Sequence, residues 1–294
     1  MPQTQPHPES TLATRTVKTR RITFDHENLG PDRYYAGDNP FASHLISTFS
    51  AVIPKGEAFF AESVRHYRSQ LDDPILRAQT STFVGQEVLH QREHERFNET
   101  IGTLGYPTEL IDRISTVTFL LCARLPHRLQ LAMTAAIEHY TSIISEHVLS
   151  GEELDSFDFP DEARAFLGWH MIEELEHKAV AFDAMQAIGT SEVERIAAMA
   201  LATAVLIPSV VGGMTISLAI DPGTYNPIKV ARSVVWLRRS IFARRSFLRD
   251  LVSYERHGFH PDERDVNEVL NVWRDKLFGP QGELSARLGT VRAS

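Results

Sequence analysis

The stretch Trp169-His170-Met171-Ile172-Glu173-Glu174-Leu175-Glu176-His177-Lys178 decides the fold. Successive residues of an α-helix are about 100° apart, so on a helix His170, Glu174 and His177 fall within about 60° of one another. Two imidazoles and a carboxylate on one narrow face are typical of a ligand-bearing helix in a metal-binding bundle. The stretch therefore predicts a helix that contributes ligands to a metal site.

A second stretch repeats this pattern, with Glu87, His90 and His94 again inside about 60° of arc. Each stretch contains a Glu-x-x-His motif, and one such motif is expected by chance in a chain this rich in both residues. Dinuclear carboxylate bundles take a Glu-x-x-His pair from each of two helices and a single glutamate from each of two others. The prediction of a dinuclear site therefore depends on finding the two single glutamates.

The composition of the 294-residue chain limits what the protein can be. A hydrophobic content of 43% is enough for a substantial core. The net charge of −8 argues against a nucleic-acid binder, and the single Cys122 excludes a disulfide framework or a multi-cysteine zinc site. The first 40 residues hold no apolar signal-peptide segment. We expect a cytoplasmic protein.

Turn and helix signals divide the chain into three predicted regions. They are an N-terminal arm over 1–40, disordered as far as residue 20, a metal-binding bundle over 41–190, and C-terminal apolar helices with a basic amphipathic segment over 191–294. No run of alternating β-branched residues indicates a strand. The predicted fold class is all-α, a ferritin-like four-helix bundle with additional C-terminal helices.

Proline and glycine signals place the four bundle helices. We expect them over 42–71, 75–104, 127–149 and 161–188, with a connecting segment over 105–126. Pro54 should bend or restart the first helix, because proline cannot donate the helical hydrogen bond. Two tight turns and one longer connection indicate antiparallel neighbours with one crossover.

The height of each glutamate above its turn selects the missing ligands. Residues equidistant from a tight turn lie side by side on antiparallel helices. Glu57 lies about 16 residues before the first turn, level with Glu87 and His90 after it, whereas Glu62 is closer to the turn and faces elsewhere. Around the second turn, Glu138 is level with Glu174 and His177, while Glu146 is about 12 Å too near the turn.

This reasoning predicts a complete ligand set and the metal that it suits. Four carboxylates provide four negative charges, which neutralise two divalent cations, and two imidazoles add neutral donors. Such a set of oxygen and nitrogen donors suits iron, with manganese as the alternative. His170 is the candidate seventh ligand, His94 is a candidate for a hydrogen bond to a ligand, and His139 and His147 are expected at the surface. The predicted ligands are Glu57, Glu87, His90, Glu138, His170, Glu174 and His177.

The motifs resemble those of a bacterial family catalogued as predicted metal-dependent hydrolases. They are Gly56-Glu57-Ala58-Phe59-Phe60, Gln86-Glu87-Val88-Leu89-His90-Gln91-Arg92-Glu93-His94, Glu138-His139-Tyr140-Thr141 and the stretch 169–178. The resemblance runs from about Arg21 to about Gly189 and continues more weakly. It implies hydrolysis by hydroxide generated at the metals.

The order of the ligands also resembles that of ferritin-like di-iron arylamine N-oxygenases. In those enzymes a histidine four residues before the last Glu-x-x-His is a seventh ligand, and His170 matches it. Similarity over the rest of the chain is slight, so the resemblance bears on the metal site more than on the substrate.

The C-terminal region carries signals of its own. Residues 196–220 are uncharged but interrupted by Pro208 and Gly212-Gly213, and Lys229 to Arg249 holds seven basic residues and no acid. The first segment predicts either a buried helix pair or dimer face, or membrane insertion. The second is typical of a basic amphipathic helix, so residues 196–249 could make a peripheral membrane contact. We expect a homodimer.

Three functions are compatible with this site. The first is a di-iron oxygenase that uses O₂ on a small organic, lipid-like substrate. The second is the hydrolase that the family resemblance implies. The third is non-enzymatic handling of iron or peroxide, as in ferritins. No nucleic-acid partner is expected.

Overall fold

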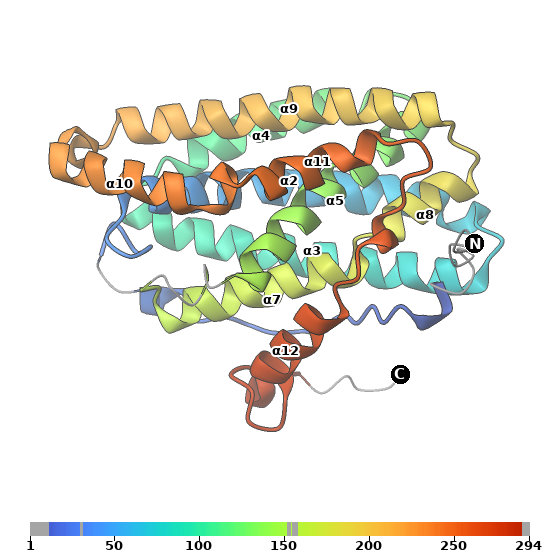
Figure 1. Cartoon of the computed structure of the whole chain (residues 1–294), viewed down its shortest axis with the longest axis horizontal. Helices are drawn as coiled ribbons and strands as arrows, with labels where there is room; N and C mark the ends of the chain where they lie inside the picture. The colour runs from blue at the N-terminus through green and yellow to red at the C-terminus, as the bar shows by residue number, and fades with distance from the viewer. Residues whose placement is uncertain (1–11, 30–31, 152–153, 155–157, 290–294) are drawn as a thin grey trace.

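A computed structural model describes residues 12–29, 32–151, 154 and 158–289 of the chain. Over these residues the secondary structure is helical and contains no strand, which confirms the all-α prediction. The bundle consists of α2 (Pro40–Tyr67), α3 (Pro74–Thr103), α5 (His127–Ser150) and α7 (Asp161–His177) with its continuation α8 (Val180–Ala187). Figure 1 shows these helices running alongside one another.

The bundle helices begin where their capping residues predict. Asn39 accepts a hydrogen bond from the Ala42 amide, and Asp73 accepts two from the first turn of α3. In both helices proline occupies the first position, where its missing N–H leaves no partner unsatisfied. The tight turn between α2 and α3 brings the two helices together along their lengths.

The expected interruption at Pro54 is wrong, because α2 runs through it. Pro54 cannot donate to the carbonyl of Ser50 one turn earlier. Instead, the side-chain amide of Asn98 on α3 donates to the Ser50 carbonyl oxygen at 2.8 Å. A side chain from the neighbouring helix thus replaces the hydrogen bond that proline removes.

Two other expected boundaries also differ. The connection over 105–126 is largely helical, since α4 (Thr108–Cys122) crosses against α2. The helix expected over 161–188 is divided into α7 and α8 at Lys178 and Ala179. There the Lys178 ammonium donates to the carbonyl oxygens of Pro261 and Arg264, at 2.9 and 2.6 Å, so the C-terminal region fixes the break.

The part of the N-terminal arm that the structure describes does not match the expected disorder. The Arg15 guanidinium forms ion pairs with Asp183 and Asp262, and its side chain is largely buried. Arg20 is buried between α7 and the C-terminal helix α12 (Asn267–Phe278). Residues 1–11 lie outside the described residues, so the prediction for them is untested.

The C-terminal region packs on the bundle. Helix α9 (Glu192–Ala219) crosses α5 and α2, and α10 (Pro227–Arg239), η4 (Ile241–Ala243) and α11 (Arg245–Val252) follow it back along the same side (Figure 1). Ser191 and Glu194 form a capping box at the start of α9. The division of the chain at residues 40 and 190 into regions remains a prediction.

Helix α9 is one continuous helix, so the expected interruption at Pro208 and Gly212-Gly213 and the expected helix pair are both wrong. Within the described chain it is the one helix long and apolar enough to cross a membrane. Only 28% of its most apolar window is buried, which is less than a core helix would show. The fold is compatible with a soluble protein, and membrane contact and dimerisation remain predictions.

Candidate metal centre

All seven predicted ligands meet in the centre of the bundle. Glu57 comes from α2, Glu87 and His90 from α3, and Glu138 from α5. Helix α7 supplies the other three, which are His170, Glu174 and His177. Every one of these side chains is buried, the most exposed being His170 at 8%.

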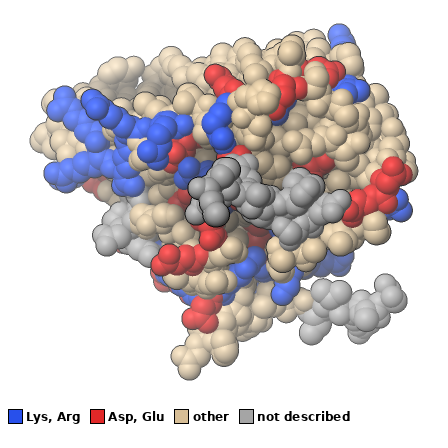
Figure 2. Space-filling view, turned by 45° about the vertical axis from the view of Figure 1, so that its right-hand side comes forward, with Lys and Arg blue, Asp and Glu red and all other residues tan. Residues whose placement is uncertain are grey.

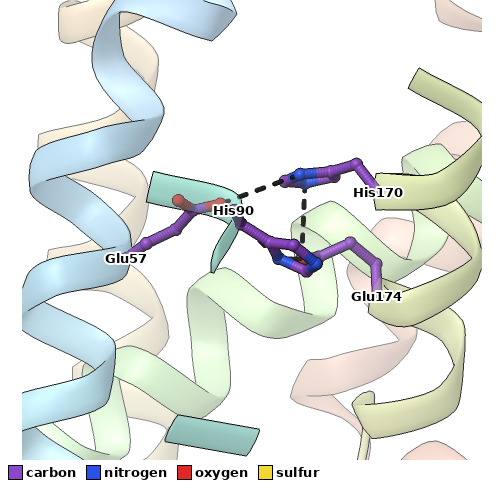
Figure 3. Close-up of side chains that lie close together, drawn as sticks. All are labelled: Glu57, His90, His170 and Glu174. Atoms are coloured by element: carbon purple, nitrogen blue, oxygen red, sulfur yellow. Dashed lines mark ion pairs between the residues drawn. The ribbon is translucent and has the colours of Figure 1, made fainter. Parts of the chain in front are cut away.

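The ligand atoms form two groups that share one carboxylate. The first group holds Glu57, His90, His170 and Glu174, and the second holds Glu87, Glu174 and His177. Figure 3 shows Glu57 extending from α2 towards His170 and Glu174 on α7, with His90 between them. Because Glu174 belongs to both groups, it is placed to bridge two ions.

Distances in the first group suit a cation between the side chains. The Glu174 Oε1 atom is 3.4 Å from His170 Nε2 and 3.6 Å from His90 Nδ1, and Glu57 Oε1 is 3.8 Å from His90 Nδ1. Ligand atoms at about 2.1 Å from one metal ion lie about 3.0–3.4 Å from each other. The spacing is therefore slightly wider than in a compact ligand shell and too wide for good hydrogen bonds.

The ligand atoms of the second group are also spaced to surround a cation. The His177 Nε2 atom is 3.3 Å from Glu174 Oε1, 3.4 Å from Glu87 Oε1 and 3.3 Å from Glu138 Oε2. One imidazole nitrogen thus faces three carboxylates, one from each of three helices. Glu138 joins this group through its contact with His177.

Unsatisfied buried atoms show that these residues fit a metal centre. Both carboxylate oxygens of Glu57, Glu87 and Glu138 are buried without a hydrogen-bond partner. The same is true of Glu174 Oε2, His90 Nδ1 and His177 Nε2. Buried polar atoms normally have partners, because leaving one unpaired costs about 1–3 kcal/mol. A pair of cations would satisfy all of these atoms together.

Electrostatics leads to the same conclusion. Burial raises the pKa values of Glu57, Glu87 and Glu138 well above the usual range for glutamate, and the neighbouring carboxylates raise them further. Burial also raises the pKa of Glu174, but the imidazoles of His177, His170 and His90 outweigh it and hold that pKa below its usual range. Four adjacent carboxylates can all ionise in a buried site only if positive charge is present.

The imidazoles of His90 and His170 are neutral, as metal ligands must be. Burial lowers the pKa of His90 to about 3 and that of His170 to about 3. Each ring therefore offers a lone pair at neutral pH, and the nitrogen that faces away from the site can donate a hydrogen bond.

An ion-paired carboxylate orients His90. Its Nε2 atom donates to Glu173 Oε2 at 3.0 Å, which leaves Nδ1 to face the site. The Arg20 guanidinium is 3.1 Å from the other oxygen of Glu173 and also binds Glu176. A carboxylate behind a ligand histidine fixes its tautomer and raises its basicity.

A chain of hydrogen bonds orients His170. Its Nδ1 atom is 3.1 Å from His94 Nε2, and His94 Nδ1 is 2.8 Å from the hydroxyl of Ser50. The Ser50 hydroxyl donates to the side-chain oxygen of Asn98 at 2.7 Å. If each group donates to the next, His170 presents its Nε2 lone pair to the site. His94 thus contacts a predicted ligand and belongs to neither ligand group.

Sequence reasoning did not find Glu173, Arg20 or Gln86. The Gln86 side chain supports His177, with its oxygen 3.3 Å from His177 Nδ1. Glu173 and Gln86 each adjoin a predicted ligand glutamate, at about 100° around the helix, and that position is the only signal in the sequence. Arg20 lies in a polar arm with no regular pattern, so nothing indicated its place.

Two glutamates and two histidines that the sequence analysis did not select as ligands lie away from the metal centre. Glu62 lies at the surface and pairs with Arg65, while Glu146 pairs with Arg264. The surface role expected for His139 and His147 is wrong. His139 is 2% exposed and donates to the carbonyl oxygen of Leu251, at 2.9 Å, because α11 covers this face of α5.

His147 lies under the same cover. Its Nε2 atom is 3.0 Å from the Asp250 carboxylate, at the end of α11. The two histidines therefore hold α11 against α5 and do not reach the metal centre.

An apolar cavity of about 210 Å³ adjoins one side of the centre. Glu57, His170 and Glu174 form part of its wall, and so does His94. The rest of the wall is dominated by isoleucine, leucine, valine and phenylalanine from α2, α5 and α7. A small apolar molecule could thus reach the first ligand group without crossing polar surface.

A Ser-His-Asp arrangement elsewhere in the fold is structural. The His44 ring lies 2.6 Å from the Ser217 hydroxyl and 2.8 Å from the Asp221 carboxylate. Ser217 and His44 are fully buried, whereas a nucleophile needs access to its substrate. The cluster joins α9 to α2.

Comparison with known proteins gives one match. A family model described as a predicted metal-dependent hydrolase covers residues 18–265. No curated protein and no solved structure matched the chain. The match covers most of the chain and includes every residue of the metal centre, so this protein belongs to the family of predicted metal-dependent hydrolases.

Proposed function

We propose that this protein is a dinuclear metal enzyme, with iron as the first choice of metal and manganese as the second, that uses O₂ to oxygenate an apolar organic substrate. In this proposal Glu57, His90 and His170 hold one ion, and Glu87, Glu138 and His177 hold the other. Glu174 bridges them, as its membership of both ligand groups supports.

The observation that carries the proposal is the apolar cavity beside the first ligand group. Of its polar residues other than the metal-centre glutamates and His170, five already have hydrogen-bond partners within the protein: Ser50, His94, Tyr140, Thr141 and Ser240. Ser145 and Trp236 are the other polar residues of the wall. Little remains to recognise an ester, amide or phosphate. A hydrocarbon needs no such recognition, and two redox-active ions held by carboxylates and imidazoles supply the oxygen-activating chemistry that such a substrate requires.

The protein's own residues then have defined tasks. Glu173 and the His94–Ser50 pair hold the rings of His90 and His170 in their ligand orientation. The apolar wall excludes water and positions the substrate beside Glu57 and His170. Orientation of a bound substrate in this way can account for a large part of an enzymatic barrier.

A second candidate is metal-dependent hydrolysis, which the description of the family favours. The same ligands could hold two redox-inert ions, and a metal pair can activate water for attack on an ester or phosphoester. The two candidates predict different metals and different products.

One pair of measurements distinguishes them. The protein is loaded anaerobically with Fe(II), exposed to O₂ with an apolar substrate present, and followed for O₂ consumption and oxygenated product. The zinc-loaded protein is assayed in parallel on esters and phosphoesters. O₂ consumption coupled to oxygenated product supports our proposal. Ester turnover with zinc, without O₂ consumption by the iron form, refutes it.

A further inference from the structure

The cavity beside the metal centre is long and narrow. Its lining residues on α5 run along one face from Ile137, next to the ligand Glu138, to Val148. Those on α2 run from Phe60, one turn beyond Glu57, back to Leu45. At 1.5 Å per helical residue, the runs on α5 and α2 span about 17 and 23 Å. The metal ligands therefore lie near one end of an elongated apolar space.

The other end of this space is covered by a short part of the C-terminal region. Trp236 from α10, and Ile241 and Phe242 from η4, complete the wall there. Trp236 and Phe242 are half-buried, and the residues that follow each of them outside the lining, 237–239 and 243–245, are exposed. At the junction of α10 and η4, therefore, only a thin layer of chain separates the cavity from the solvent.

Positive charge is concentrated at the same junction. Arg238 and Arg239 directly precede the lining residue Ser240, and both are exposed. Within the part of the chain that the structure describes, neither forms an ion pair or a hydrogen bond, and the same holds for Arg245. Figure 2 shows Lys and Arg side chains gathered over the end of the molecule where α10 lies.

Other basic residues of this region already have acidic partners. Lys229 and Arg232 pair with Asp38, and Arg249 pairs with Asp250. Arg238 and Arg239 thus remain available to an anion outside the protein. They lie next to the end of the cavity that is farther from the metal centre, so the length of the cavity separates their positive charge from the metal ligands.

We propose that the ligand of this cavity is an amphiphile with an unbranched apolar chain and an anionic head group. The chain lies along α5 and α2 with its far end beside Glu57 and His170, and the carboxylate, sulfate or phosphate head lies beside Arg238 and Arg239. This assignment rests on the proposed function, because it identifies the chain as the part of the substrate that reaches the metal centre.

Quenching of Trp236 fluorescence by brominated fatty acids tests the position of each end. The protein is titrated anaerobically, without reductant, with dodecanoate brominated at carbon 2 or at carbon 12. We expect the 2-bromo compound to quench Trp236 strongly and the 12-bromo compound to quench it weakly. The Trp236→Phe variant identifies the signal, since Trp169 and Trp273 are the other tryptophans.

Arginine variants test the head group. Arg238→Gln together with Arg239→Gln should weaken dodecanoate binding about tenfold, because two exposed charges that attract the head group are lost, and should leave dodecanol binding unchanged. Arg65→Gln together with Arg113→Gln is the matched control, since both arginines are exposed and neither lines the cavity. The control should bind dodecanoate as the wild type does.

Several results would overturn the inference. Stronger quenching by the 12-bromo compound would place the head at the metal end, and equal affinity for dodecanol and dodecanoate would remove the role of the arginines. Binding only to vesicles of anionic lipid, and not to monomeric dodecanoate, would assign the arginines to a membrane surface. Metal content and O₂ consumption are measured separately, so failure of the oxygenase proposal is distinguishable from failure of this one.

Discussion

Replacing Glu173 by glutamine tests whether the charge of this carboxylate strengthens metal binding through His90, without disturbing the packing of the bundle. The Glu173 carboxylate accepts a hydrogen bond from His90 Nε2 at 3.0 Å, and both side chains are fully buried. Glutamine has nearly the same size and can still accept this bond. The variant therefore removes the negative charge behind His90, and with it the ion pair between Glu173 and Arg20.

The size of the effect follows from the difference between two hydrogen bonds. A buried bond to a charged acceptor contributes about 1.5–3 kcal/mol and a neutral one about 1 kcal/mol, so Glu173→Gln should lose about 1–2 kcal/mol of metal binding. That corresponds to about 5–30-fold weaker affinity, within the range expected for a carboxylate behind a ligand histidine. Burial raises the pKa of Glu173 to about 8, so the comparison belongs near pH 9, where most of the wild-type carboxylate is ionised.

Glu176→Gln is the matched control. Glu176 lies on the same helix, is equally buried and binds the same Arg20, but it contacts Arg274 in place of a metal ligand. Competition with a chelator gives the metal affinity of each variant. We expect Glu176→Gln to change it less than about threefold. Equal losses in the two variants, or wild-type affinity in Glu173→Gln, would refute a specific role for Glu173.

Two other predictions concern the site. His170→Ala should keep most of the iron but alter the optical and Mössbauer signature after O₂ is added, because a neutral donor is lost; an unchanged signature would remove His170 from the ligand set. In the metal-free protein, the raised pKa values of Glu57, Glu87 and Glu138 mean that the folded chain keeps protons the unfolded chain has lost. Its stability should therefore fall as the pH rises above about 6.5, where the glutamates and histidines of the unfolded chain have lost their protons, by up to about 1.4 kcal/mol per pH unit for each retained proton. Denaturant titrations should show that fall without metal and a smaller one with it; a flat metal-free curve would contradict it.

The bundle and its inward-facing ligands could be predicted because both depend on local periodicity. Helical spacing aligned His170, Glu174 and His177, and distance from a turn distinguished Glu57 from Glu62. Both signals need only the geometry of a helix and of a tight helical hairpin. The structure brings all seven predicted residues to one place, and their binding of metal remains the proposal to be tested.

The features that were missed depend on contacts between distant parts of the chain. The amide of Asn98 that lets α2 continue through Pro54 comes from another helix. Arg20 reaches Glu173 from an arm whose composition resembles disorder. His139 is buried because α11 returns across α5, more than 100 residues later. Periodicity within one segment contains no information about such partners.

The assignment of a dinuclear centre bridged by Glu174 is tested most directly by the number of metal ions per chain. Elemental analysis of the reconstituted wild type should give two metal ions per chain. Glu174→Ala should lose both, because Glu174 belongs to both ligand groups, and Glu62→Ala should keep both, because Glu62 lies at the surface. A wild type that binds one ion or none, or a Glu174→Ala variant with full metal content, would contradict the assignment.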